Sequence, residues 1–137
     1  FSSTQEVLDS LGEGVADGIV SNHVLEHTLN PLQELINLRL LLKKNGVISF
    51  VVPCESINNK YFSSDVNKHL YTWSPINLGH LFKEAGYSNI NAHAYLHKRP
   101  PFYKNIAKLG WPIFNTLSYI YGFFSRSVSQ VRIVATR

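Results

Sequence analysis

Residues 47–52 read Val-Ile-Ser-Phe-Val-Val and are followed by Pro53. Every residue of this run except Ser49 is β-branched or aromatic, and these are the residue types that favour strands. A β-prone run without regular apolar–polar alternation is typical of a strand that is covered on both faces. The sequence therefore predicts a buried central strand that ends at the proline, and the flanking segments indicate what covers it.

Helices are predicted on either side of this strand. Asn30-Pro31 begins the first, with the asparagine as N-cap and the proline at the first helical position, where no backbone N–H is needed. This helix is expected to run to about residue 42, and Asn45-Gly46 supplies a left-handed stop. After the strand, Ser74-Pro75 begins a second helix that Gly86 ends.

Strands and helices alternate along the rest of the chain. The other predicted elements are a helix at 3–12, a strand at 18–22, a strand around 90–96, a helical aromatic stretch at 103–124 and a strand at 131–135. This alternation favours an α/β fold, with helices on the faces of one sheet. With 137 residues, the chain has room for a single domain.

The composition narrows the class of protein. Hydrophobic residues make up 45% and charged residues 16%, which excludes a disordered chain. The single cysteine, Cys54, excludes a disulfide framework and a cysteine-based zinc site, and it fits a reducing compartment. No segment has the pattern of a secretory signal, so we expect a cytoplasmic protein. The chain opens at Phe1 and contains no methionine, so we expect it to be a fragment of a longer protein.

Charge and aromatic residues are distributed unevenly. Residues 1–84 hold all nine acidic residues and six Lys/Arg, whereas residues 85–137 hold no acid and seven Lys/Arg. Eight of the seventeen aromatic residues lie between Phe102 and Phe124. A basic aromatic segment can meet phosphates, an anionic membrane surface or an acidic substrate, and it can equally be a packed lobe with a solvated basic rim.

The segment Ser21-Asn22-His23-Val24-Leu25-Glu26-His27 follows directly from the strand predicted at 18–22. Ligands of open α/β sheets bind at the carboxyl ends of strands. If the chain turns helical there, His23, Glu26 and His27 share one face and can hold a divalent cation or offer an imidazole as general base. The alternative is a Glu–His pair that hydrogen-bonds a loop backbone.

Several motifs follow one another in a defined order and spacing. They are Asp17-x-Ile19-Val20, Val24-Leu25-Glu26-His27, Asn30-Pro31, Leu42-Lys43-Lys44-Asn45-Gly46, Val52-Pro53 and Leu81-Phe82-x-x-Ala85-Gly86-Tyr87. Together they resemble the C-terminal half of a class I S-adenosylmethionine-dependent methyltransferase of the "LEH" type, over roughly residues 6–96 and the final strand. The resemblance implies a partial Rossmann-like sheet with helices on both faces, an antiparallel last strand and no N-terminal cofactor-binding strands.

The resemblance also implies methyl transfer from S-adenosylmethionine to an oxygen, nitrogen or carbon, with oxygen favoured. The residues expected to touch the cofactor are Ser21, Asn22, His23, Val24 and Leu25. Any proton transfer is expected from His23 or His27, with Glu26 orienting a histidine or capping the loop. The family's glycine-rich loop is not found here, since no GxGxG occurs, so this chain alone is expected to bind the cofactor weakly or not at all and to be inactive.

A narrower resemblance concerns metal. Some members of the superfamily bind a divalent cation through an E-x-x-E-H string, and the enzymes that methylate small RNAs add a later histidine. Here the string reads His23-x-x-Glu26-His27, and His69-x-x-x-Trp73 follows. A set of His23, Glu26, His27 and His69 is therefore the metal-bearing alternative. Because many relatives carry "LEH" without using metal, we expect none.

The segment 97–128 is expected to be an aromatic, basic, lid-like insertion before the last strand of a single domain spanning 1–137. The acceptor implied is a small molecule or a glycan- or lipid-like compound, with nucleic acid as a lesser option. Residues 111–124 are too few to span a bilayer. The strand at 18–22 would leave an open edge, which another copy of the chain or the stretch 102–124 would cover.

The competing hypothesis is a non-catalytic α/β module that binds a partner or forms oligomers. Other candidate residues are predicted to be structural. Tyr71 and Trp73 are expected to be lid or core aromatics, Cys54 to line a pocket, and His80 and His97 to lie on the surface.

Overall fold

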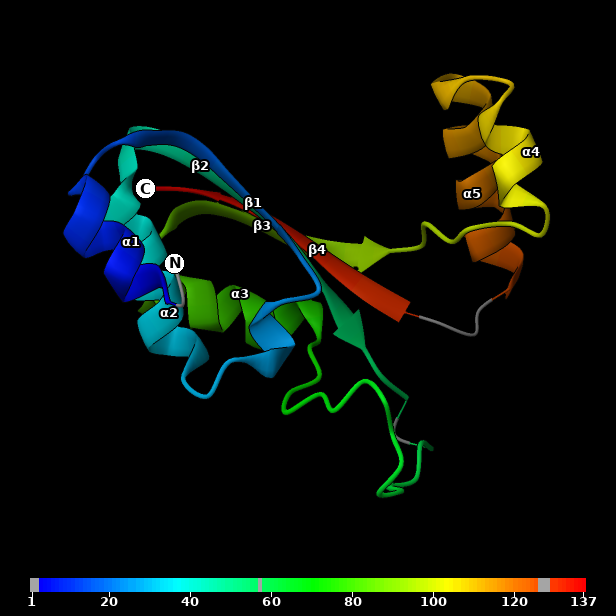
Figure 1. The fold of residues 1–137 in the computed structure, drawn as a ribbon, viewed down its shortest axis with the longest axis horizontal. Helices are drawn as coiled ribbons and strands as arrows, with labels where there is room; N and C mark the ends of the chain where they lie inside the picture. Colours follow the sequence, from blue (N-terminus) through cyan, green and yellow to red (C-terminus); the bar gives the residue numbers. More distant parts are fainter. Residues whose placement is uncertain (1–2, 57, 126–128) are drawn as a thin grey trace.

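The computed structural model describes residues 3–56, 58–125 and 129–137. Its centre is a four-stranded sheet with the order β1-β2-β4-β3. The strands are β1 (Ala16–Asn22), β2 (Leu42–Cys54), β3 (Ser88–Tyr95) and β4 (Ser129–Thr136). β1 runs parallel to β2, whereas β4 lies between β2 and β3 and is antiparallel to both, as Figure 1 shows. The predicted α/β class and the antiparallel last strand are confirmed.

Three helices, α1 (Thr4–Leu11), α2 (Pro31–Leu41) and α3 (Pro75–Glu84), begin at the caps that the sequence indicates. The side chains of Ser3 and Asn30 each accept a hydrogen bond from the backbone N–H three residues later. Ser74 and Asn77 form a reciprocal capping box at the start of α3. Because these caps are local, the sequence predicts the helix starts to within one or two residues.

The prediction of helices on both faces of the sheet is wrong for the described residues. Helices α1, α2 and α3 all lie on one face (Figure 1). Burial along β2 accordingly alternates: Ile48, Phe50 and Val52 are fully buried, while Val47 is 43% exposed. The Phe50 ring meets that of Phe82 on α3 edge to face, with 5.8 Å between centroids. The apolar run at 47–52 is therefore covered on one face by this chain's own helices.

Asn45-Gly46 does not stop helix α2, which ends at Leu41 and passes directly into β2. The pairing register jumps instead, from Ala16 opposite Leu42 to Gly18 opposite Val47. Asn45 adopts a left-handed φ of 65° within this irregularity. The dipeptide provides the left-handed turn that the sequence indicates, but the turn is a bulge within the strand.

Between β3 and β4 the chain forms a helical hairpin of α4 (Tyr103–Ala107) and α5 (Trp111–Ser125), which lies beyond the sheet in Figure 1. The predicted aromatic stretch is thus two helices, broken at Gly110 with its positive φ of 98°. The proposed insertion 97–128 extends past the described residues, since 126–128 lie outside them.

Of the two expected covers for the edge strand, another copy of the chain or this stretch, the second is wrong. β1 is at one edge of the sheet with Val20 84% exposed, whereas the hairpin follows β3 at the other edge.

Within the described part of the chain, no helix is both long enough and apolar enough to cross a membrane.

The hairpin is fixed to the segment after β3 through two small residues of α5. Ser118 is fully buried, and its backbone oxygen accepts a hydrogen bond from the Lys98 amide at 3.1 Å. One turn on, Gly122 lies so close to the Leu96 carbonyl that an added Cβ would overlap that oxygen. Only glycine permits this close approach, so residue 122 fixes the position of α5 against residues 96–98.

Gly122→Ala is expected to release α5 from residues 96–98 and to destabilise the folded chain by about 1–3 kcal/mol, as overpacked sites do. The measurement is hydrogen exchange at the Lys98 amide together with thermal unfolding. Gly79→Ala in α3 is the matched control, because its added Cβ would meet only the Ala92 side chain at an ordinary 3.9 Å. Unchanged protection of Lys98 in Gly122→Ala would contradict this packing.

Candidate functional site

The end of β1 turns sharply at His23. This residue has a left-handed φ of 53°, and its backbone N–H still donates to Val51 on β2 at 2.9 Å. A single 3₁₀ turn, η1 (Leu25–His27), follows and is closed by the Thr28 hydroxyl, which donates to the Leu25 carbonyl. The left-handed residue and the tight turn together direct Glu26 inward.

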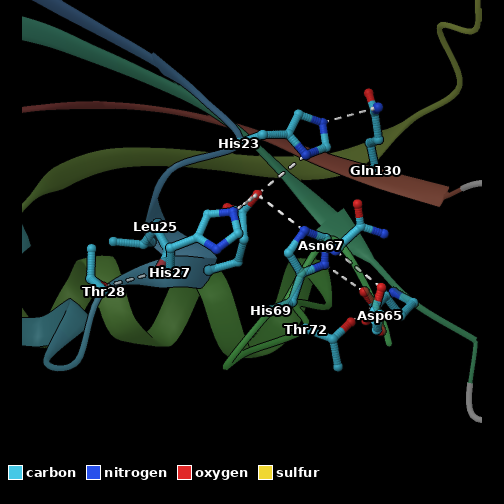
Figure 2. A network of polar contacts seen from close by, with 11 residues as sticks. His23, Leu25, His27, Thr28, Asp65, Asn67, His69, Thr72 and Gln130 are labelled. Atoms are coloured by element: carbon cyan, nitrogen blue, oxygen red, sulfur yellow. Dashed lines mark hydrogen bonds and ion pairs between the residues drawn. The ribbon is translucent and has the colours of Figure 1, made fainter. Parts of the chain in front are cut away.

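Glu26 is completely buried, and neither of its carboxylate oxygens accepts a hydrogen bond of good geometry from any described residue. Imidazole nitrogens instead surround its Oε1. His23 Nδ1 lies at 3.3 Å, and the Nε2 atoms of His27 and His69 each lie at 3.9 Å. Figure 2 shows His23 and His27 on the turn after β1 and His69 on a later loop, with their rings directed towards one another. Burying a carboxylate is costly unless charges or donors face it, and these imidazoles are the polar groups that lie against it.

His69 reaches this point because its loop is tied to the ends of the strands. The Leu70 amide donates to the Glu26 carbonyl at 2.8 Å, and the Glu55 amide donates to the Thr72 hydroxyl at 2.7 Å. His69 Nδ1 lies 2.5 Å from the Glu55 carboxylate. Since a carboxylate accepts, Nδ1 carries the proton and Nε2 faces Glu26.

His23 is held from the opposite side by β4. The Gln130 amide nitrogen lies 3.2 Å from His23 Nε2. Because an amide NH₂ only donates, His23 Nε2 is the acceptor in this pair, and Nδ1 then carries the proton towards Glu26. The contact joins residues 107 positions apart, so the sequence alone gave no reason to expect Gln130 here.

Two cavities flank the cluster, and His23 lines both. The larger, of about 850 Å³, lies between the sheet and the hairpin. It is lined by Asn22, His23, Val51, Tyr95, His97, Lys98, Arg99, Tyr103, Ala107, Phe114 and Gln130. The smaller, of about 580 Å³, includes His27, Cys54, Glu55 and His69. Cys54 thus lines a cavity, as the sequence indicates.

His97, which the sequence placed on the surface, is half-buried in the larger cavity. Its ring stacks on Tyr95 at 5.7 Å and meets Tyr119 edge to face at 5.2 Å. Burial lowers the pKa of His97; a hydrogen bond to the Asn115 side chain opposes this shift, and the nearby Arg99 charge adds to it. Its Nε2 is buried without a partner among the described residues. The aromatic residues that follow it in sequence were the signal that could have identified this position.

The predicted cofactor-binding residues divide between two cavities. Asn22 and His23 line the large one, whereas Ser21, Val24 and Leu25 line a third cavity of about 220 Å³ on the other side of β1. That volume is below the roughly 300–1,000 Å³ of typical small-molecule sites. The residues present therefore fit only part of a nucleotide-sized cofactor.

A metal-binding alternative can be tested against the same geometry. One ligand atom each from Glu26, His27 and His69 lies within 4.8 Å of the others. Tetrahedral Zn²⁺ with bonds of about 2.0–2.2 Å needs ligand atoms roughly 3.4 Å apart. The separations of 3.9 Å from Glu26 Oε1 exceed this by about half an ångström, so the cluster would have to contract around an ion.

We predict that Zn²⁺ leaves the melting temperature of the chain unchanged, because the open spacing suits carboxylate–imidazole contacts better than coordination. Differential scanning fluorimetry with and without the ion provides the measurement, and His27→Ala is the control variant. A rise in melting temperature that His27→Ala abolishes would contradict the prediction and make the cluster a metal site.

The parallel pair β1–β2, the antiparallel β4 and the polar cluster at the carboxyl end of β1 define a Rossmann-like fold of the methyltransferase class. Residues 3–92, more than half of the chain, match the family described as a methyltransferase domain, and the chain belongs to that family. A comparison with curated proteins finds no match.

Solved structures agree with this assignment. The chain resembles an S-adenosylmethionine-dependent methyltransferase from Archaeoglobus fulgidus, with a TM-score of 0.62, 18% identity and coverage of 99% of this chain and 66% of that one. It also resembles phosphoethanolamine N-methyltransferase 2 of Haemonchus contortus (TM-score 0.56, 13% identity, 88% of this chain, 33% of that one). A third similar structure is the [4+2]-cyclase SpnF (TM-score 0.55, 14% identity, 91% of this chain, 52% of that one).

These likenesses concern the fold, because all three identities are low. The chain spans less than two thirds of the length of each of these proteins.

Proposed function

We propose that this chain is the C-terminal half of an S-adenosylmethionine-dependent methyltransferase of the "LEH" type, and that it supplies the acceptor side of the active site. The observation that carries the proposal is that His23 and Gln130 lie together on the wall of the large cavity, with the buried Glu26 behind His23, in a chain of the methyltransferase domain family. The cofactor, when bound, supplies the methyl group.

His23 is the general base in this proposal. Glu26 faces Nδ1 at 3.3 Å and favours the tautomer that leaves Nε2 as an acceptor towards the cavity. The Gln130 amide at 3.2 Å marks the position from which an acceptor hydroxyl would donate its proton. This is the carboxylate–imidazole arrangement that lets a histidine take a proton from a hydroxyl, and it favours O-methylation.

His27 has a supporting role in the same proposal. Its side chain is 45% exposed, and its ring meets that of His69 edge to face at 5.1 Å. It therefore stabilises the buried Glu26 carboxylate from the side of the smaller cavity. His27 remains the second candidate for proton transfer to an acceptor bound there.

The lining of the large cavity supports a small-molecule, glycan- or lipid-like acceptor. Tyr95, Tyr103 and Phe114 give it aromatic walls, and Arg99 adds a cation 5.6 Å above the Tyr103 ring. A nucleic-acid acceptor has less support, because Trp73 is only 6% exposed and cannot offer its face to a base.

The alternative is a non-catalytic module that binds a partner or another copy of the chain. The exposed edge strand β1 favours it, because an uncovered edge can pair with another chain. The similar structure of SpnF is described as a [4+2]-cyclase, so a protein of this fold need not be described as a methyltransferase.

The isolated 137-residue chain is expected to bind S-adenosylmethionine weakly or not at all. Its candidate residues face two separate cavities, one of which is too small for the cofactor. Isothermal titration calorimetry provides the measurement, with S-adenosylhomocysteine as a second ligand. Micromolar binding by this chain would refute the idea that it holds only part of the site.

In the full-length protein, His23→Ala is expected to lower methyl transfer roughly 10²- to 10⁴-fold, the usual contribution of a general base. The assay follows label from methyl-labelled S-adenosylmethionine into small-molecule fractions, and mass spectrometry identifies the O-methylated product. His80→Ala, on the exposed surface of α3, is the control and should retain full activity. Equal rates for His23→Ala and His80→Ala would remove His23 from the mechanism, and no transfer by the unaltered protein would favour the binding module.

A further inference from the structure

Helix α5 carries its apolar side chains outward. Ile113, Leu117, Ile120 and Phe124 recur at helical spacing and are 47%, 37%, 49% and 77% exposed. The face directed towards the protein has the small residues Ser118 and Gly122 buried along its centre, with Asn115, Ser125 and the aromatic residues Phe114 and Tyr121 half-buried beside them. A surface helix of a soluble domain normally buries its apolar stripe, whereas α5 leaves its aliphatic stripe exposed.

The orientation is fixed by packing. Gly122 sits against the Leu96 carbonyl, and Ser118 accepts the hydrogen bond from Lys98. Turning the helix would bring a branched or aromatic side chain to the place where even a methyl group overlaps the Leu96 oxygen. The apolar stripe therefore cannot turn inward while α5 keeps this contact.

The rest of the hairpin extends the exposed apolar surface. Its large apolar side chains that are at least 37% exposed, which we call the hairpin face, are Phe102, Leu109, Trp111, Ile113, Leu117, Tyr119, Ile120, Phe123 and Phe124. A shallow groove of about 310 Å³ runs through it, lined by Leu96, Tyr119, Ile120, Phe123 and Phe124. Exposed apolar surface on this scale marks an interaction site.

The positive charge of this segment helps to decide which kind of partner binds the hairpin face. Residues 85–137 contain no acidic side chain, and the hairpin itself carries the exposed Lys104 and Lys108. A second copy docked through the same face would bring like charges together, which disfavours self-association there. An anionic surface would instead be attracted by the lysines while it accepts the aromatic side chains.

We infer that the α4–α5 hairpin docks the protein onto an anionic lipid bilayer, with the hairpin face in the headgroup and upper acyl region. Tryptophan, phenylalanine and aliphatic side chains on one face of a helix, together with nearby lysines, are the composition of interfacial helices. At 15 residues, α5 is about 22 Å long, shorter than the hydrocarbon core of about 30 Å, so it lies along the surface.

Co-sedimentation of the intact chain with vesicles tests this inference and needs no cofactor or acceptor. Binding is expected to vesicles of phosphatidylcholine with about one third phosphatidylglycerol, and much weaker binding to phosphatidylcholine alone. Ile120→Ser/Phe124→Ser should lower the partition coefficient about tenfold or more, because both side chains are exposed and lose only lipid contact. Tyr61→Ser/Phe62→Ser, which removes aromatic residues 93% and 59% exposed outside the hairpin, is the matched control.

The charge contribution is tested separately. Lys104→Glu/Lys108→Glu should weaken binding to the anionic vesicles about tenfold or more, and raised salt should act in the same direction. Lys60→Glu/Lys83→Glu makes the same change in net charge at exposed positions away from the hairpin and should have a smaller effect.

Fluorescence reports the depth of insertion. The chain has two tryptophans, Trp73 and Trp111. Trp73→Phe should preserve the fold, because the buried Trp73 indole nitrogen has no partner among the described residues, and it leaves Trp111 as the reporter. Since Trp111 is 69% exposed, its emission should shift to shorter wavelength with anionic vesicles, and brominated acyl chains should quench it.

The following outcomes would overturn the inference that the hairpin docks on lipid. Failure to sediment together with an unshifted Trp111 emission would overturn it, as would equal partitioning of the hairpin and control variants. Concentration-dependent dimers that Ile120→Ser/Phe124→Ser abolishes, with no vesicle binding, would show that the face is an interface between copies and would also overturn it. Circular dichroism of every variant ensures that lost binding is not lost folding.

Discussion

A buried carboxylate at the end of β1 constrains the surrounding structure. Glu26 is withdrawn from water without a backbone donor among the described residues, and burying such a group unpaired costs several kcal/mol. The groups that face this carboxylate are imidazoles. His23 and His27 come from the same turn, and His69 comes from a loop more than forty residues further on. The buried carboxylate therefore lies where two segments that are distant in the sequence meet.

The same carboxylate also orients His23. A histidine between two acceptors or two donors has no preferred tautomer, but here a carboxylate faces Nδ1 and an amide NH₂ faces Nε2. Both partners favour the tautomer whose Nε2 is unprotonated and accepts a hydrogen bond, and this atom lies beside the large cavity. Because Gln130 belongs to β4, the last strand of the sheet helps to orient a residue at the end of the first.

The elements that the sequence predicts well are those whose causes are local. The capping residues Ser3, Asn30 and Ser74 fix helix starts through hydrogen bonds within one turn, and each helix begins where expected. The grouping of His23, Glu26 and His27 is likewise a matter of a few residues. The Gln130 contact and the covering of only one sheet face depend on pairings between distant segments, which the local sequence pattern does not record. The run at 47–52 shows how far a local pattern can predict burial. Its apolar residues indicate a strand covered on both faces, whereas the described helices cover only one.

The hairpin connects the cavity to the exposed apolar surface. Tyr103, Ala107 and Phe114, which line the large cavity, belong to the same two helices whose outer side chains form the hairpin face. One side of α5 therefore lines the cavity that contains His23, and its other side is exposed to the surroundings. Gly122 holds both in place, since its contact with Leu96 sets the rotation of the helix. An acceptor with an apolar tail and a reactive hydroxyl would match this arrangement, because its tail could remain in lipid beside α5 while its hydroxyl reaches the cavity. If the hairpin docks on lipid as proposed, the exposed stripe of α5 would place such an acceptor and the candidate base on the two sides of one helix.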